Sequence, residues 1–288
     1  MDLSILHDRE GFPKHVIDSL AKAPVDYLEQ LAFIDKHKES KTPWEAGGIL
    51  LLLSFLEKGS REGGPSGEYA FLLNKRSKKV RQAGDLCAPG GGIHPYLDRV
   101  LQWLLFWGLI PLGRARGLEP AKKRGEEINK KVLLFLANAL RESWEEIRLS
   151  PFNVEFLGAL PTYGLHSRQW FIFPVVGRVK RSWKPKLSWE VEKIVSIPLK
   201  TFYQPENYAL YSLEVPETLA AQGLPHLWEF PCLVYDQGGE EEILWGATFN
   251  IIQSFLRIIF PYPLPIPDRL RVIHKPLVAN YFSGSKEA

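Results

Sequence analysis

One uninterrupted helical segment in the middle of the chain constrains the fold most. Residues 131–149, KVLLFLANALRESWEEIRL, contain neither proline nor glycine and are mostly good helix formers. They predict a single long helix that begins near Lys131. On this helix Glu142, Glu145 and Glu146 stand at positions i, i+3 and i+4, so three carboxylates share one face about 5 to 6 Å apart. Such crowding destabilises a bare helix, and a hard cation such as Mg²⁺ would reverse the penalty.

The acidic face has two interpretations. One is a solvated stripe that pairs with Arg141 and Arg148. The other is a metal site, and the flanking sequence favours it. A PGGG run at residues 89–92 cannot continue a helix and marks a close approach of backbone, and LGALP downstream is typical of a strand. Glycine amides beside an acidic helix can line one cleft for a metal diphosphate.

The remaining segments alternate between strands and helices. Short apolar or alternating runs, bounded by glycine, proline or charge, predict strands: GGILLLLSFLE, GEYAFLLNKRS, VEFLGALP, QWFIFPVVGRV and KIVSIPL. EEILWGATFNIIQSFLRIIF predicts a short strand that runs into a second long helix. With no internal repeat or low-complexity linker, we expect one α/β domain at residues 41–260, a helical extension at 1–40 and a C-terminal tail at 261–288.

Composition narrows the class of protein. The chain has 288 residues, 45% hydrophobic and 24% charged, which is enough for a globular core. Its net charge of +3 suits an anionic ligand without arguing for nucleic acid. Cys87 and Cys232 have neither disulfide-framework nor zinc spacing, so we expect a cytoplasmic protein. Its apolar runs are shorter than the roughly 20 residues of a transmembrane helix.

Taken together, the motifs resemble the Nudix hydrolase family, and within it the coenzyme A pyrophosphatase-like branch. The resemblance is carried by LLNKRSKKVRQAGDLCAPGGG and ALRESWEE, and it continues through LGALPTY, FPVVGRV, EVEKIVSIPLKTF and LWGATFNIIQSFL. It spans roughly residues 45 to 258. It implies an α/β/α sandwich with a mixed β-sheet.

The resemblance also implies a set of functional residues. Glu142, Glu145 and Glu146 would bind Mg²⁺ or Mn²⁺, and Arg141 would orient them. One of these glutamates or a loop carboxylate would activate water. Three basic residues before the glycine run and two glycines within it would bind the phosphates of a nucleoside diphosphate-linked substrate such as coenzyme A or an acyl derivative. These five are Lys75, Arg76, Arg81, Gly90 and Gly91.

Two departures from the family pattern leave an alternative open. Leu133 stands where the usual motif has a glutamate, and Arg148 replaces the glycine that normally follows the acidic cluster. Neither position is usually a main metal ligand. A non-catalytic binding or regulatory module with the same fold is therefore the alternative to a hydrolase.

A larger departure is an insertion at about residues 99–131, between the glycine run and the acidic helix. Its first half, VLQWLLFWGLIPLG, is apolar and aromatic, and its second half, RARGLEPAKKRGEEINKK, is rich in basic residues. This order is typical of a segment at a membrane surface. We consider three roles: peripheral membrane contact through residues 100–124, a lid over the substrate, or a helix buried in the core. Membrane contact would also admit a hydrolase of lipid-linked diphosphates.

Overall fold

The structure, a computed structural model, describes residues 2–58, 66–215, 226–276 and 281. Its central sheet is built around β1 (Glu45–Lys58), which pairs antiparallel with β2 (Ser66–Arg76) and parallel with β7 (Trp170–Val179). β3 (Leu86–Cys87) and β5 (Val154–Ala159) complete the order β3-β2-β1-β7-β5. Three further strands pair beside this path: β4 (Gly90–Gly92) with β1, β6 (Tyr163–Leu165) with β7, and β8 (Val191–Pro198) with β2. The sheet is therefore mixed.

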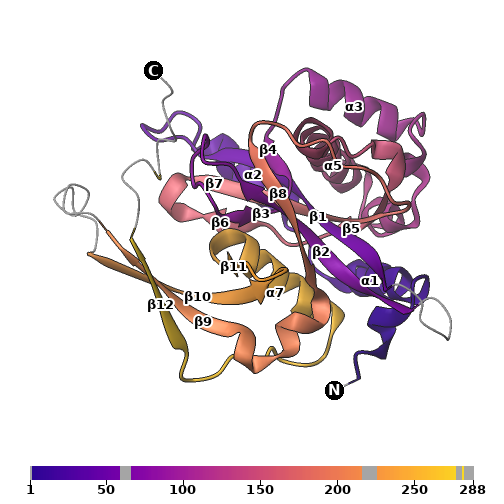
Figure 1. Cartoon of the computed structure of the whole chain (residues 1–288). Helices are drawn as coiled ribbons and strands as arrows, with labels where there is room; N and C mark the ends of the chain where they lie inside the picture. The colour runs from indigo at the N-terminus through magenta and orange to yellow at the C-terminus, as the bar shows by residue number, and fades with distance from the viewer. Residues whose placement is uncertain (1, 59–65, 216–225, 277–280, 282–288) are drawn as a thin grey trace.

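Helices cover both faces of this sheet (Figure 1). Alternate residues of β1 point to opposite sides, so Leu50 and Leu52 join one buried cluster while Leu51 and Leu53 join the other. The first cluster is completed by α2 (Tyr27–Lys36), α3 (Leu97–Phe106) and α5 (Glu126–Ile147), the second by α1 (Gly11–Lys22) and α7 (Gly246–Ile259). This arrangement confirms the α/β/α sandwich with a mixed sheet that the sequence predicts.

A second sheet of four strands was not anticipated from the sequence. It has the order β11-β10-β9-β12 and lies beside α7, in orange to yellow in Figure 1. Its strands are β9 (Tyr208–Glu214), β10 (Leu227–Asp236), β11 (Glu241–Leu244) and β12 (Arg271–Pro276). β12 lies within the segment expected to be a tail, and it pairs in parallel with β9.

The described residues of the N-terminal extension also belong to the core. Within residues 1–40, a short 3₁₀ helix η1 (Ser4–His7) precedes α1 and α2, and Phe12, Val16 and Tyr27 are fully buried. The N-terminal helices thus form part of both core layers. Among the described residues, no helix is long and apolar enough to cross a membrane.

The inserted segment folds as a set of short helices that precede α5 in the chain and pack against it. α3 is followed by 3₁₀ turns η2 (Pro111–Arg114) and η3 (Arg116–Leu118) and by α4 (Glu119–Lys123). α5 then begins at Glu126, earlier than the Lys131 start expected from the sequence. Four further 3₁₀ turns connect later strands: η4 (Pro151–Asn153), η5 (His166–Arg168), η6 (Leu199–Tyr203) and η7 (Pro205–Asn207).

Candidate active site

Helix α5 carries the acidic residues on its last two turns. Its inner face buries Leu133, Leu136 and Leu140 against the sheet, and this anchors the helix. The position where the related motif has a glutamate, Leu133, is therefore a core residue. The helix ends at Arg148, which adopts the left-handed conformation (φ 55°) and places its guanidinium 5.4 Å from the centre of the Trp144 ring. Arg148 thus ends the helix at the position where the related motif has glycine.

The glycine run lies directly against the acidic end of α5. β4 pairs with β1, with Gly91 opposite Gly48. A Cβ on Gly91 would stand 2.5 Å from Glu142 Oε1, and one on Gly48 would stand 2.8 Å from the carbonyl oxygen of Phe135. The helix can approach these strands because neither position carries a side chain. The Gly90 amide also donates a long hydrogen bond, 3.4 Å, to Glu146 Oε1.

Arg141 ties three carboxylates together. Its Nε donates to Asp98 Oδ1 at 2.7 Å, and its two terminal nitrogens donate to Glu142 Oε1 and Glu145 Oε2, each at 2.9 Å. It also donates to the carbonyl oxygen of Gly92 at 3.0 Å. Its pKa is raised because the hydrogen bonds and charges of these acids outweigh the effect of burial. Arg141 therefore positions the carboxylates and stays charged.

Glu146 is the most buried of the three glutamates at the end of α5. Its side chain accepts a 2.6 Å hydrogen bond from Asn74 Nδ2 on β2, and the residue is 8% exposed. Burial raises its pKa to about 8, with a further increase from the charge of Glu142 and an opposing effect of the Asn74 bond. Burial also raises the pKa of Glu142, although Arg141 opposes it. Two neighbouring carboxylates thus bind protons more tightly than a free glutamate, mainly because both are buried.

The residues present fit a magnesium ion. Within the described residues, no three His, Cys, Asp or Glu side chains converge as a closed metal site. Mg²⁺ does not require one, because it usually keeps several waters and is held by one or two carboxylates together with substrate phosphates. Glu142 and Glu146 supply two hard oxygen ligands whose raised pKa values a cation would lower. Glu145 lies one helical turn after Arg141 and pairs with its guanidinium, and its side chain is 49% exposed.

The structure separates the three basic residues expected to bind phosphate. Lys75 points to the face of the sheet opposite Asn74 and pairs with Glu240 and Glu242 at 3.0 and 3.1 Å. Arg76 Nε donates to the carbonyl oxygen of Arg81 at 2.7 Å, which ties the end of β2 to the middle of the loop before β3 (Leu86–Cys87). Arg81 itself is exposed. The Lys75 side chain therefore lies within a neighbouring acidic cluster, away from Glu146.

Two positioning residues were missed from the sequence. Asp98, on the first turn of α3, is fully buried and receives the bonds from Arg141 and one from the His94 amide at 2.7 Å. Asn138, also fully buried, accepts from the Gly48 amide at 2.7 Å and donates to the Gly92 carbonyl at 2.8 Å and to Asp98. Asn138 could have been found as the one polar residue in an apolar stretch, one turn before Glu142. Nothing local marks Asp98.

A separate hollow lies towards the other end of β1. Its volume is about 670 Å³, and it is lined by residues that include Ser54, Arg178, Trp183 and Ser196. None of the carboxylates on α5 line it. The acidic site is therefore distinct from this hollow and is defined by the contact of α5 with β2 and β4.

Comparisons with known proteins find similarity only among solved structures. No family model and no curated protein matches the chain. A Nudix hydrolase from Nitrosomonas europaea aligns over 79% of this chain and 97% of its own, with 14% identity and a TM-score of 0.32. The Nudix domain of Shewanella oneidensis NrtR, complexed with ADP ribose, aligns over 60% and 82%, with 15% identity and a TM-score of 0.30. A C. elegans Ap4A hydrolase aligns over 54% and 81%, with 12% identity and a TM-score of 0.32. These similarities are weak, so the functional conclusion below rests on the residues of this chain.

Proposed function

We propose that the protein is a Mg²⁺-dependent hydrolase of the Nudix type that cleaves a diphosphate linkage in a nucleoside diphosphate derivative. The observation that carries this proposal is the contact of the Gly90–Gly92 strand with Glu142 and Glu146, whose pKa values are both raised. An ordinary solvated stripe would not bury one of its acids against a neighbouring strand.

Each residue of the site has a role in this proposal. Glu142, Glu145 and Glu146 would hold the cation, with Glu145 at its solvent side. The cation, when bound, neutralises charge on the diphosphate oxygens and lowers the pKa of a coordinated water. Arg141, held by Asp98, fixes the orientation of Glu142 and Glu145. Asn74 and the Gly90 amide fix the two oxygens of Glu146. Arg76 and Arg81 would bind the substrate phosphates.

The finer choice of substrate is coenzyme A or an acyl derivative, and it rests on the resemblance of the sequence to the coenzyme A pyrophosphatase-like branch. The rival proposal is a module that binds such a nucleotide without cleaving it. The three intact glutamates at the end of α5 support the hydrolase, because a module that only binds has no need to bury Glu146 beside Glu142.

A hydrolysis screen tests the proposal. Purified protein is incubated with coenzyme A, acyl-coenzyme A, ADP-ribose, dinucleotides and lipid diphosphates in the presence of Mg²⁺, Mn²⁺ or a chelator, and the products are separated by chromatography. We expect at least one compound to be cleaved. This cleavage should require the metal and should be lost in Glu146→Gln. Binding of a nucleotide without cleavage of any compound in either metal would establish the module instead.

A further inference from the structure

The outer surface of α3 and the turn after it carry an unusual concentration of exposed apolar side chains. Among the described residues, fourteen large hydrophobic side chains are exposed, and seven of them lie within residues 96–109. The most exposed are Tyr96 (72%), Trp107 (62%), Leu109 (61%) and Trp103 (55%). Monomeric proteins rarely leave such a contiguous patch uncovered unless it binds something.

These side chains lie on one face of the helix. Leu97, Val100, Trp103 and Trp107 follow helical spacing on the outer side, while Asp98 and Leu105 on the inner side are fully buried. A surface helix normally turns charged and polar residues outward. α3 is apolar inside, where it packs on α5, and apolar outside as well. Packing in the core therefore does not account for the apolar side chains on the outer face of α3, whereas binding to a partner would.

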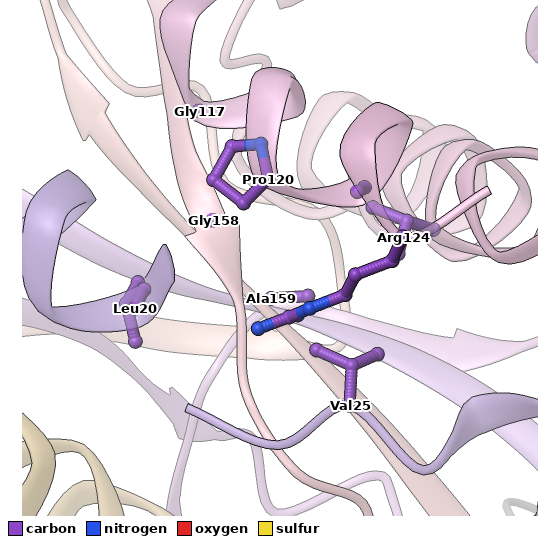
Figure 2. Close-up of a pocket in the computed structure, with 9 residues that line it drawn as sticks. Leu20, Val25, Gly117, Pro120, Arg124, Gly158 and Ala159 are labelled. Atoms are coloured by element: carbon purple, nitrogen blue, oxygen red, sulfur yellow. The ribbon is translucent and has the colours of Figure 1, made fainter. Parts of the chain in front are cut away.

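The segment after α3 holds this helix in place. Gly117 passes so close to β5 that a Cβ there would stand 2.4 Å from the carbonyl oxygen of Phe156. Arg124 reaches across a small gap, as Figure 2 shows, and donates to the carbonyl oxygens of Ala21 and Ala23. Leu112, Leu118 and Ala121 are buried in the same core cluster as α5. The insertion is thus an integral, packed part of the domain, and its aromatic face points outward.

The segment that carries the aromatic face is also rich in basic residues. Residues 93–124 contain six basic and two acidic residues, a net charge of +4, whereas the whole chain has +3. The rest of the protein is therefore slightly acidic, and the positive charge belongs to this region. Arg99, Arg116 and Lys123 are exposed, and Lys130 lies over the Phe106 ring at 5.9 Å.

We propose that the outer face of α3, with these basic residues, docks the protein onto an anionic lipid bilayer. Tryptophan and tyrosine favour the boundary between headgroups and acyl chains, and lysine and arginine are attracted to anionic headgroups. Neither contact requires a partner pocket. The two halves of the inserted segment supply the apolar and the electrostatic component of one interface.

Docking would bring the candidate active site to the membrane surface, a consequence that rests on the proposed function. His94 and Tyr96 directly follow the Gly90–Gly92 strand, and Asp98 on the inner face of α3 binds Arg141. The same helix therefore touches both the bilayer and the residue that orients the glutamates. A diphosphate that carries an acyl or lipid chain would fit this geometry, with the chain in the bilayer and the phosphates at α5.

Flotation with phospholipid vesicles tests the docking. Deletion of residues 100–124 is unsuitable because it removes buried residues such as Leu105 and Leu118. The test therefore uses the full chain, Trp103→Ala/Trp107→Ala, and the matched control Trp189→Ala, whose side chain is similarly exposed (64%) on another part of the surface. Vesicles are pure phosphatidylcholine or phosphatidylcholine mixed with phosphatidylglycerol.

We expect the wild-type protein to float with the anionic vesicles at low salt and to be released at about 0.5 M salt, where charge attraction is screened. The double variant should bind about 100-fold more weakly, since each buried tryptophan contributes roughly a factor of ten. Trp189→Ala should bind like the wild type. Hydrolysis of a water-soluble substrate should be unchanged in all variants, which separates failure of docking from failure of the proposed activity.

Two results would overturn the proposal. The first is wild-type protein that stays at the bottom of the gradient with anionic vesicles at low salt. The second is binding that survives in the double variant or is weakened equally by Trp189→Ala. In either case the α3 face would have another occupant, which could be a protein.

Discussion

Two clusters of acidic residues in this protein contain the same kinds of side chain and differ in their balance of charge. The α5 cluster consists of Asp98, Glu142, Glu145 and Glu146, and within the described residues Arg141 is its only ion-pair partner. The β11 cluster consists of Glu192, Glu240 and Glu242 with Lys75 and Lys193.

The pKa values follow this balance. In the β11 cluster, hydrogen bonds from Lys193 and Lys75 lower the pKa of Glu240 to about 2. In the α5 cluster, burial and like charge raise the pKa of Glu146 to about 8. Nearby lysines satisfy the first group of acids, whereas the second group is short of positive charge. The acids of the α5 cluster therefore have negative charge left for a bound cation to neutralise, whereas those of the β11 cluster are already paired with lysines.

The largest effect is expected on turnover when the α5 cluster is changed. Glu146→Gln keeps the shape of the side chain but removes a charge that holds the cation, so hydrolysis should fall by roughly 10²-fold or more. Glu145→Gln should also reduce turnover strongly. The measurement is the Mg²⁺-dependent rate on the best substrate from the screen. Glu242→Gln, the matched change in the β11 cluster, should keep its rate, and equal losses in both clusters would contradict the distinction.

The next largest effect concerns Asp85, a half-buried acid that belongs to neither cluster. Asp85 accepts hydrogen bonds from Tyr281 and from Trp245 Nε1, and burial raises its pKa from 3.8 to about 6. A pKa that is higher in the folded state favours folding below the unfolded value and loses this contribution as pH rises through about 6. The loss between pH 4 and pH 7 should be about 2 kcal/mol.

Denaturant unfolding of wild type and Asp85→Asn across this pH range measures the contribution. Because asparagine does not titrate, the difference in the free energy of unfolding between the two proteins isolates Asp85. We expect this difference to favour the wild type most at the acidic end and to shrink towards neutral pH. A difference that stays constant would mean that Asp85 remains ionised in the folded protein.

Substitution of Lys75 tests whether lysines stabilise the acids of the β11 cluster. Lys75→Met should lower the free energy of unfolding by about 2 kcal/mol, because it leaves Glu242, which is 2% exposed, with Lys193 alone. KM and kcat should change little. A rise in KM without loss of stability would instead restore the phosphate-binding role that the sequence predicts for Lys75.

The smallest effect is expected for Arg81, the exposed basic residue on the loop before β3. Arg81→Ala should raise KM by up to about tenfold with a smaller change in kcat, since a cation that grips a phosphate equally in ground and transition states contributes to binding alone. Steady-state kinetics measure this directly. Equal losses in kcat and kcat/KM, with KM unchanged, would indicate contact in the transition state.

The sequence by itself determined the elements whose signals are local. The absence of proline and glycine after Lys131, together with helix-forming residues, predicted the long helix. Its 3.6-residue period alone placed Glu142, Glu145 and Glu146 on one face. The α/β class followed from alternating runs of strand and helix type. The strands β9, β10 and β12 were missed. Pro231 interrupts β10 and β12 is almost entirely exposed, so neither shows the apolar pattern on which strand prediction relies.

Only the tertiary structure decided which charges meet. Asn74 and Lys75 are neighbours in sequence, but side chains alternate along a strand, so Asn74 reaches Glu146 while Lys75 reaches Glu240 on the opposite face. Likewise, Asp98 meets Arg141 only because the inserted helix α3 packs on α5. The helical and strand periods predict which residues share a face. They do not predict what that face will contact, because its neighbours come from segments far away in the chain.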